Sequence, residues 1–173
     1  MTDAEMRQLI QETVGAQHRA AAFTPGAGLA RLRAPASADA LDRLAKYLSA
    51  NGLRFPPSYR QFLSITDGID DLMDRYGVSF RSADEVIAES ASDKAWARTP
   101  VHRFVIASGN SNSFVGFDPR TVAPDGEMHV VLIDDIGDED ESDSLEQFLR
   151  EQLDFFEDVV SGEQADRAGL KDD

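Results

Sequence analysis

Cysteine is absent from this chain of 173 residues, which excludes disulfides, thiol nucleophiles and cysteine-ligated metals. Long apolar runs are also absent: none approaches the ~20 residues that a membrane helix needs. The first residues, Met1 to Glu5, are acidic and lack the basic region and apolar core of a signal peptide. Together these absences predict a cytoplasmic protein that does not enter a membrane.

Catalytic motifs are missing as well. The three histidines, His18, His102 and His129, show none of the spacings that bring two metal ligands together. The segment 109–113 contains serines but lacks the Gly-x-Ser-x-Gly pattern of a nucleophile elbow, so we interpret it as a polar turn. The glycines at 26 and 28 lack the third glycine of a dinucleotide fingerprint and follow no strand. We therefore expect no enzymatic activity and no cofactor.

What the chain does have is the composition of a folded domain. Hydrophobic residues make up 42% and charged residues 28% of the sequence. A chain of this length can bury roughly 70% of its unfolded surface, which is enough for one substantial core. The single tryptophan, Trp96, fits either core packing at a helix edge or an anchor in an interface.

Negative charge is concentrated in one part of the chain. The net charge is −15, yet residues 1–133 contribute only −2. Residues 134–158 hold 12 acidic residues and a single basic one, Arg150, for a net charge of −11. Such a field repels nucleic acids and anionic membranes and attracts basic partners, although a solvated acidic face that only maintains solubility is an equal alternative.

Helix-start signals recur along the chain. Thr2 and Glu5 form a capping box that predicts a helix over 3–21, and a Pro/Gly-rich connector follows it. Ser37, Pro57, Ser82 and Ser144 mark the starts of four more helices. The second helix is expected to stop at Gly52, and the last to fray after Gly162.

Beta-rich runs lie between the helices, at residues 76–80, 101–107, 112–118 and 127–133. Short links predict that the successive strands pair antiparallel. The expected fold class is α+β, with N-terminal helices, a central antiparallel sheet and a C-terminal helix packed on that sheet. We divide the chain into an N-terminal helix and connector (1–35), an α+β domain (36–162) and a flexible acidic tail (163–173).

A set of ordered motifs runs from about residue 37 to 160. It comprises Phe55-Pro56-Pro57-Ser58-Tyr59-Arg60-Gln61-Phe62-Leu63, the Asp67-Gly68 turn, Ser82–Ile87, Gly116-Phe117-Asp118 and Phe148-Leu149. In this order the motifs resemble the SUKH superfamily, with Phe55 in place of the usual leucine and Asp67 in place of the usual asparagine. That superfamily consists largely of bacterial immunity proteins and includes yeast regulators of cell-wall synthesis.

The resemblance implies a non-enzymatic protein that neutralises a cognate bacterial toxin by direct contact. A basic toxin domain such as a nuclease would suit the acidity, and neither nucleic acid nor membrane is an expected partner. An intracellular scaffold or regulator without a toxin is the alternative, and the oligomeric state is left open. The residues expected to meet the partner are Asp134, Asp135, Asp138, Glu139, Asp140 and Glu141. Their spacing does not match the calcium-loop pattern, so we expect no metal site there.

Overall fold

The computed structural model describes residues 1–24, 26–73, 78–90, 104–108, 114–133 and 139–169. Its helices are α1 (Asp3–Ala21), α2 (Ala38–Ala50), α3 (Pro57–Ile65), α4 (Ala83–Ser90) and α5 (Leu145–Gly169). Its strands are β1 (Arg31–Leu32), β2 (Ile69–Met73), β3 (Val78–Phe80), β4 (Val105–Ser108), β5 (Phe114–Phe117), β6 (Val130–Ile133) and β7 (Glu139–Ser142). Trp96 and His102 lie outside the described residues.

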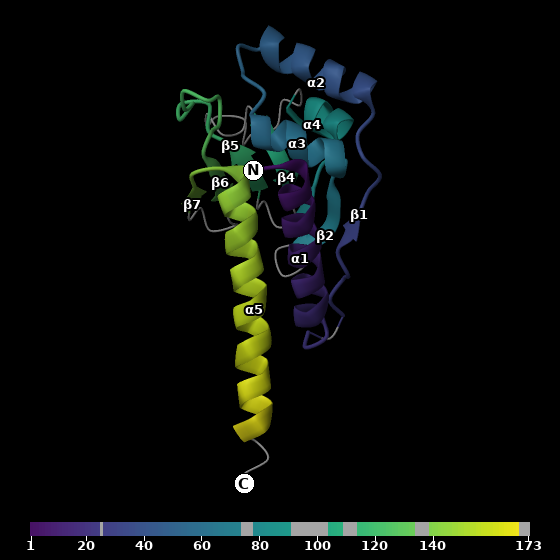
Figure 1. The fold of residues 1–173 in the computed structure, drawn as a ribbon, viewed down its shortest axis with the longest axis vertical. Coiled ribbons are helices and arrows are strands. Elements are labelled where there is room, and N and C mark those ends of the chain that lie inside the picture. The colour runs from purple at the N-terminus through teal and green to yellow at the C-terminus, as the bar shows by residue number, and fades with distance from the viewer. Residues whose placement is uncertain (25, 74–77, 91–103, 109–113, 134–138, 170–173) are drawn as a thin grey trace.

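The strands form a single antiparallel sheet in which spatial order follows chain order from β1 to β7. In Figure 1, α1 and α5 lie side by side along one face of this sheet, with their N-terminal ends together. Helix α5 begins immediately after β7 and packs back on the sheet. The predicted α+β class, with N-terminal helices and a C-terminal helix on an antiparallel sheet, is confirmed.

Helices begin where the sequence signals predict. The Thr2 hydroxyl accepts a hydrogen bond from the Glu5 backbone N–H at 3.3 Å, and the Glu5 carboxylate accepts one from the Thr2 backbone N–H at 2.6 Å. Ser82 and Glu85 form the same reciprocal pair at α4, with distances of 3.2 and 2.7 Å. Because each pair satisfies two otherwise unpaired N–H groups, the residues fix their helix starts locally.

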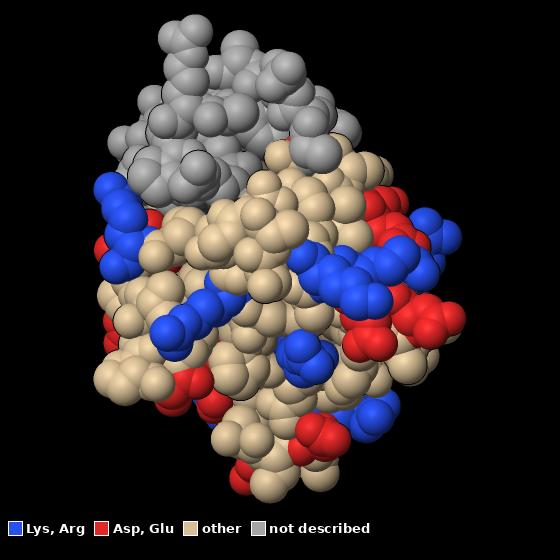
Figure 2. Space-filling view, turned by 90° about the horizontal axis from the view of Figure 1, so that it is seen from above, with Lys and Arg blue, Asp and Glu red and all other residues tan. Residues whose placement is uncertain are grey.

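Helices α2 and α4 pack against each other at one end of the molecule. Their facing sides are joined at the surface by Arg43, which makes a bidentate ion pair with Asp84 at 2.8 and 2.9 Å. Figure 2, which looks onto this end, shows basic and acidic side chains interspersed. The acidity of the chain is therefore not spread over the end formed by α2 and α4.

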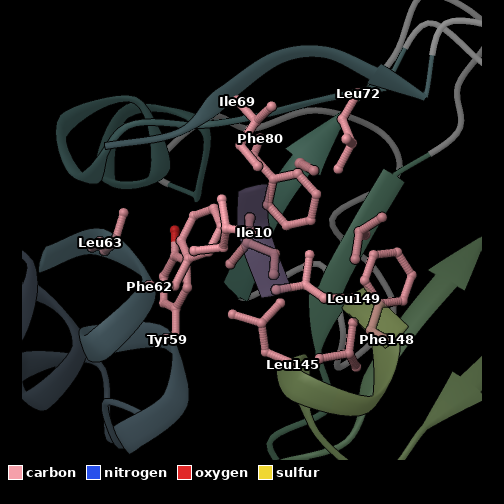
Figure 3. Close-up of a cluster of buried hydrophobic side chains, with 14 of the residues drawn as sticks. Ile10, Tyr59, Phe62, Leu63, Ile69, Leu72, Phe80, Leu145, Phe148 and Leu149 are labelled. Atoms are coloured by element: carbon pink, nitrogen blue, oxygen red, sulfur yellow. The ribbon is translucent and has the colours of Figure 1, made fainter. Parts of the chain in front are cut away.

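The core lies between the sheet and the helices. Figure 3 shows side chains of α1, α3 and α5 meeting those of β2 and β3 in one apolar cluster. Tyr59, Phe62 and Leu63 of α3 are fully buried there, as their helical spacing predicts. On the opposite face of the sheet, Val105, Phe114 and Val131 form a second, smaller cluster.

Three features differ from the sequence predictions. Strands β1 and β2 were not expected, and Asp71 in β2 has a φ of +58°, at an irregularity in the pairing of β2 with β3. Residues 139–142 were expected in an acidic loop, but they pair with β6 as β7. Helix α5 continues through Gly169, past the fraying expected after Gly162. For the three strands, pairing with distant parts of the chain outweighs a weak local signal.

Candidate functional site

Strand β7 is an edge of the sheet within the described residues, and it carries the acidic segment. Its register with β6 places Glu141 opposite Val131 and Asp140 opposite Leu132. Since side chains alternate along a strand, Asp140 and Glu141 point to opposite faces. Both are exposed, so two carboxylates stand at one edge of the sheet, one on either side.

The C-terminal end of β7 is tied to the rest of the fold by side-chain contacts. Ser142 is buried and donates a hydrogen bond to the Glu151 carboxylate of α5. Glu141 lies 2.5 Å from His129 Nδ1, and Asp143 Oδ1 lies 3.9 Å from His129 Nε2. These contacts hold the acidic strand in a fixed position, although its residues have low intrinsic preference for strands.

His129 in turn adjoins a buried carboxylate. The Asp118 backbone N–H donates to the His129 carbonyl at 3.0 Å, and the His129 N–H donates to the Thr121 hydroxyl at 2.9 Å. The Asp118 side chain is 4% exposed and accepts bonds from Arg120 Nε at 2.9 Å and from the Arg120 backbone N–H at 2.9 Å. Hydrogen bonding by the Arg120 guanidinium lowers the pKa of Asp118 below its ordinary value of 3.8, despite burial, which raises it.

A hollow of about 880 Å³ lies where the β7–α5 junction faces the start of α3. Five carboxylates from separate parts of the chain line it: Asp3, Asp125, Glu127, Asp143 and Glu146. Arg60 is the single basic side chain among its described lining residues, and its guanidinium carbon lies 4.7 Å from the centre of the Phe55 ring. We call this the acidic hollow.

Some of these carboxylates also support the fold. Glu127 accepts hydrogen bonds of 2.7 Å from both the N–H and the hydroxyl of Ser58, and so caps α3, whose N-cap residue Pro56 has no capping side chain. Asp3 accepts a bond of 2.8 Å from Gln61, and Glu146 one of 2.8 Å from Arg150. Asp143 is 81% exposed and extends the row of carboxylates from β7 into the acidic hollow.

The structure places the predicted contact residues as follows. Glu139, Asp140 and Glu141 come together on β7, while Asp134, Asp135 and Asp138 lie outside the described residues. A role of these six residues in binding stays a prediction. The predicted contact residues did not include any of the five carboxylates of the acidic hollow. Only the fold brings Asp3, Asp125 and Glu127 beside Asp143 and Glu146.

The chemistry available here is electrostatic. In the described part of the chain, no three histidine, aspartate or glutamate side chains are arranged to hold a metal ion. His18, on α1, lies 2.7 Å from the Ala30 carbonyl and so helps to hold the connector against the helix. No described helix is both long and apolar enough to cross a membrane. The site offers exposed carboxylates to a cationic surface.

Comparison with protein families shows which family the chain belongs to. The SMI1 / KNR4 family model (SUKH-1) matches residues 35–151, about two thirds of the chain. The chain belongs to this family. The SUKH assignment from the ordered motifs is thereby confirmed, and the family includes immunity proteins. No curated protein is significantly similar to the chain in sequence.

Within this SUKH domain the signature residues have structural positions. The Phe55–Leu63 stretch forms α3 and the segment before it, and Phe148 and Leu149 of α5 join the same core. The match covers α2 to the start of α5 and includes β7. It does not extend to α1 or to the part of α5 beyond residue 151.

Proposed function

We propose that this protein is an immunity protein that neutralises a toxin by direct contact, with the acidic edge as its docking surface. By acidic edge we mean β7, Asp143 and the acidic hollow. The single observation that carries the proposal is the position of this carboxylate row on a SUKH domain. It acts by binding, without a catalytic step.

The physical basis is charge complementarity. Residues 134–158 carry a net charge of −11, and β7 and the acidic hollow bring part of that charge to one side of the fold. A toxin that cleaves nucleic acid has a basic groove for phosphates, and a surface of carboxylates competes for that groove. Steering by such a field raises association rates by about 10- to 10³-fold. A stable complex buries on the order of 1,600 Å² in total.

The geometry also suits a cationic anchor. The acidic hollow has room for a side chain, and an arginine from the partner would meet carboxylates from several segments of the chain. Arginine is enriched among residues that dominate binding energy at interfaces. Asp143 is exposed, whereas Glu127 is already held by hydrogen bonds from Ser58. The incoming group would therefore meet an exposed carboxylate beside one that is fixed in position.

The test begins with the partner. The tagged full-length protein is used to capture partners from its own cells, and the captured protein is identified by mass spectrometry. The gene for that partner is then expressed alone and together with this protein. Immunity predicts that the partner alone stops growth and that co-expression restores it. A captured partner that is harmless when expressed alone would instead support the scaffold or regulatory role.

A further inference from the structure

Helix α5 is longer than the helix beside it. The Thr13 hydroxyl of α1 lies 3.4 Å from the Leu149 carbonyl, and Arg19 forms an ion pair with Glu157. Helix α1 ends at Ala21, whereas α5 continues to Gly169. Figure 1 shows the C-terminal part of α5 projecting past the end of α1. That part of α5 therefore lacks the neighbour that covers its first half.

A groove of about 510 Å³ lies at this step between the two helices. On the side of α1 it is lined by Ala20 and Ala21 together with the polar Gln17, and the two alanines leave room for another backbone to approach. The apolar residues that line it are Ala20, Ala21, Ala27, Phe155, Phe156 and Val159.

Phe155 is the most informative of these. Its exposed fraction is 39%, and no other aromatic side chain in the described part of the chain is among the exposed large apolar residues. Its ring centre lies 5.5 Å from that of Phe156, which is buried, so the exposed ring is held against a fixed support. Rigid aromatic side chains beside a hollow are typical anchors of protein interfaces.

The surroundings of the groove are acidic. Asp158, Glu163 and Asp166 are exposed and line it, and no lysine or arginine is among its described lining residues. Helix α5 as a whole carries seven acidic and two basic residues. A second copy of this chain would bring two such helices together, and like charges in contact disfavour that arrangement. A basic occupant would be attracted by the same charges.

We propose that this groove is a docking site for a basic amphipathic helix of a partner protein. The occupant continues the line of α1 along the projecting part of α5, with its apolar face on Phe155 and Val159 and its basic face toward Glu163 and Asp166. The groove is built from α1, the connector and α5 beyond residue 151, outside the family match. It is separate from the acidic edge and does not depend on the proposed immunity function.

The experiment uses the full-length protein and a synthetic fluorescent peptide. The peptide has about 18 residues, enough to form a helix, with leucine at helical spacing on one face and lysine and arginine on the other. A second peptide has the same leucines and glutamate in place of every basic residue. Binding is followed by fluorescence anisotropy. We expect the basic peptide to bind at least ~10-fold more tightly than the acidic one.

Variants localise the binding. Phe155→Ser should weaken binding of the basic peptide by about 10-fold or more, whereas Val122→Ser, at another exposed apolar residue away from the groove, should leave it unchanged. Glu163→Lys should weaken binding severalfold more than Asp42→Lys on α2. Thermal unfolding shows that each variant is folded.

Three results would overturn the proposal. The first is equal affinity of the native protein and Phe155→Ser for the basic peptide, or no binding at all. The second is equal affinity of the native protein for both peptides, which removes the role of charge. The third is self-association of the native protein in sedimentation that Phe155→Ser abolishes, since the occupant is then a second copy.

Discussion

The Asp67 carboxylate accepts a hydrogen bond of 2.7 Å from the backbone N–H of Ala83, so the turn that ends α3 caps the start of α4. The same turn is fixed from the other side, because the Asp67 N–H donates to the Ala34 carbonyl at 2.9 Å. Thr66 adds a hydroxyl bond of 2.6 Å to the Gly68 carbonyl. These contacts join the connector, α3, β2 and α4, which gives the family signature a structural role.

Gly68→Ala should destabilise the fold. Gly68 has a φ of +111°, and a methyl group there would lie 2.5 Å from the Phe80 carbonyl oxygen. We expect the free energy of unfolding to fall by roughly 2–4 kcal/mol in urea denaturation, because strain and a backbone clash combine. Gly26→Ala is the matched control: its φ is +83° with nothing within 4 Å, so it should lose only about 1 kcal/mol. Equal losses at both sites would contradict the clash.

Phe62→Ala should act on stability and not on binding. Phe62 is fully buried, with its ring centre 5.4 Å from that of Phe80 and 6.1 Å from that of Tyr59. Its removal leaves a cavity that should lower the free energy of unfolding by roughly 3–5 kcal/mol. Calorimetry and partner capture below the melting temperature check this. A variant that unfolds like the native protein but no longer binds its partner would show a functional role instead.

Tyr59→Phe should leave stability unchanged or raise it by about 1 kcal/mol. The Tyr59 hydroxyl is buried and has no hydrogen-bond partner among the described residues, and burial raises the pKa of Tyr59. Removing the oxygen keeps the ring contacts with Phe104 and Phe117. Tyr59→Leu, which loses those contacts, should be clearly destabilised in the same urea titration. A loss on Tyr59→Phe as large as that on Tyr59→Leu would reveal a needed hydroxyl.

Asp118→Asn should weaken the fold at neutral pH and not in acid. Hydrogen bonds from Arg120 lower the pKa of Asp118, so its ionised form stabilises the folded state. That stabilisation is present above the unfolded pKa and is lost as the pH falls through the lower, folded pKa. We expect about 1 kcal/mol at pH ~7, since Arg120 is exposed and water screens the pair, and a vanishing difference toward pH ~2.

The control for this pH dependence is Asp42→Asn, at an exposed position on α2. It should change the free energy of unfolding by less than ~0.5 kcal/mol at either pH. If Asp118→Asn instead lowers the free energy of unfolding by the same amount in acid and at neutral pH, that result contradicts the prediction. The stabilisation by Asp118 would then not depend on its ionised form.

Local chemistry in the sequence predicted most of the helices. At three helix starts a side chain accepts a hydrogen bond from an otherwise unpaired N–H, and at α3 a proline has no N–H to pair. The capping residues are Thr2 with Glu5, Ser37, and Ser82 with Glu85, and the proline is Pro57. Such signals need no tertiary context. The apolar spacing of α3 likewise predicted that Tyr59, Phe62 and Leu63 are buried.

The features that the sequence did not predict depend on contacts between residues far apart in the chain. Strand β2 contains two aspartates, one at a positive φ, and β7 is made of acids and a serine, so neither has the alternation that predicts a strand. Pairing with β3 and β6 makes them strands. The acidic hollow could not be predicted for the same reason: its carboxylates come from three separate segments, and no motif joins Asp3 to Asp125 or Asp143.

We propose that the acidic edge is the surface that meets a basic partner. The most direct test is the association rate of the captured partner at low and high salt, measured by stopped-flow for the native protein and for Asp140→Asn/Glu141→Gln. Glu12→Gln/Asp42→Asn, away from β7, is the control with equal loss of charge. We predict slower association and a flatter salt dependence for the β7 variant alone, because exposed charges are screened beyond ~8 Å at physiological ionic strength. Equal rates and equal salt slopes for all three proteins would contradict the account.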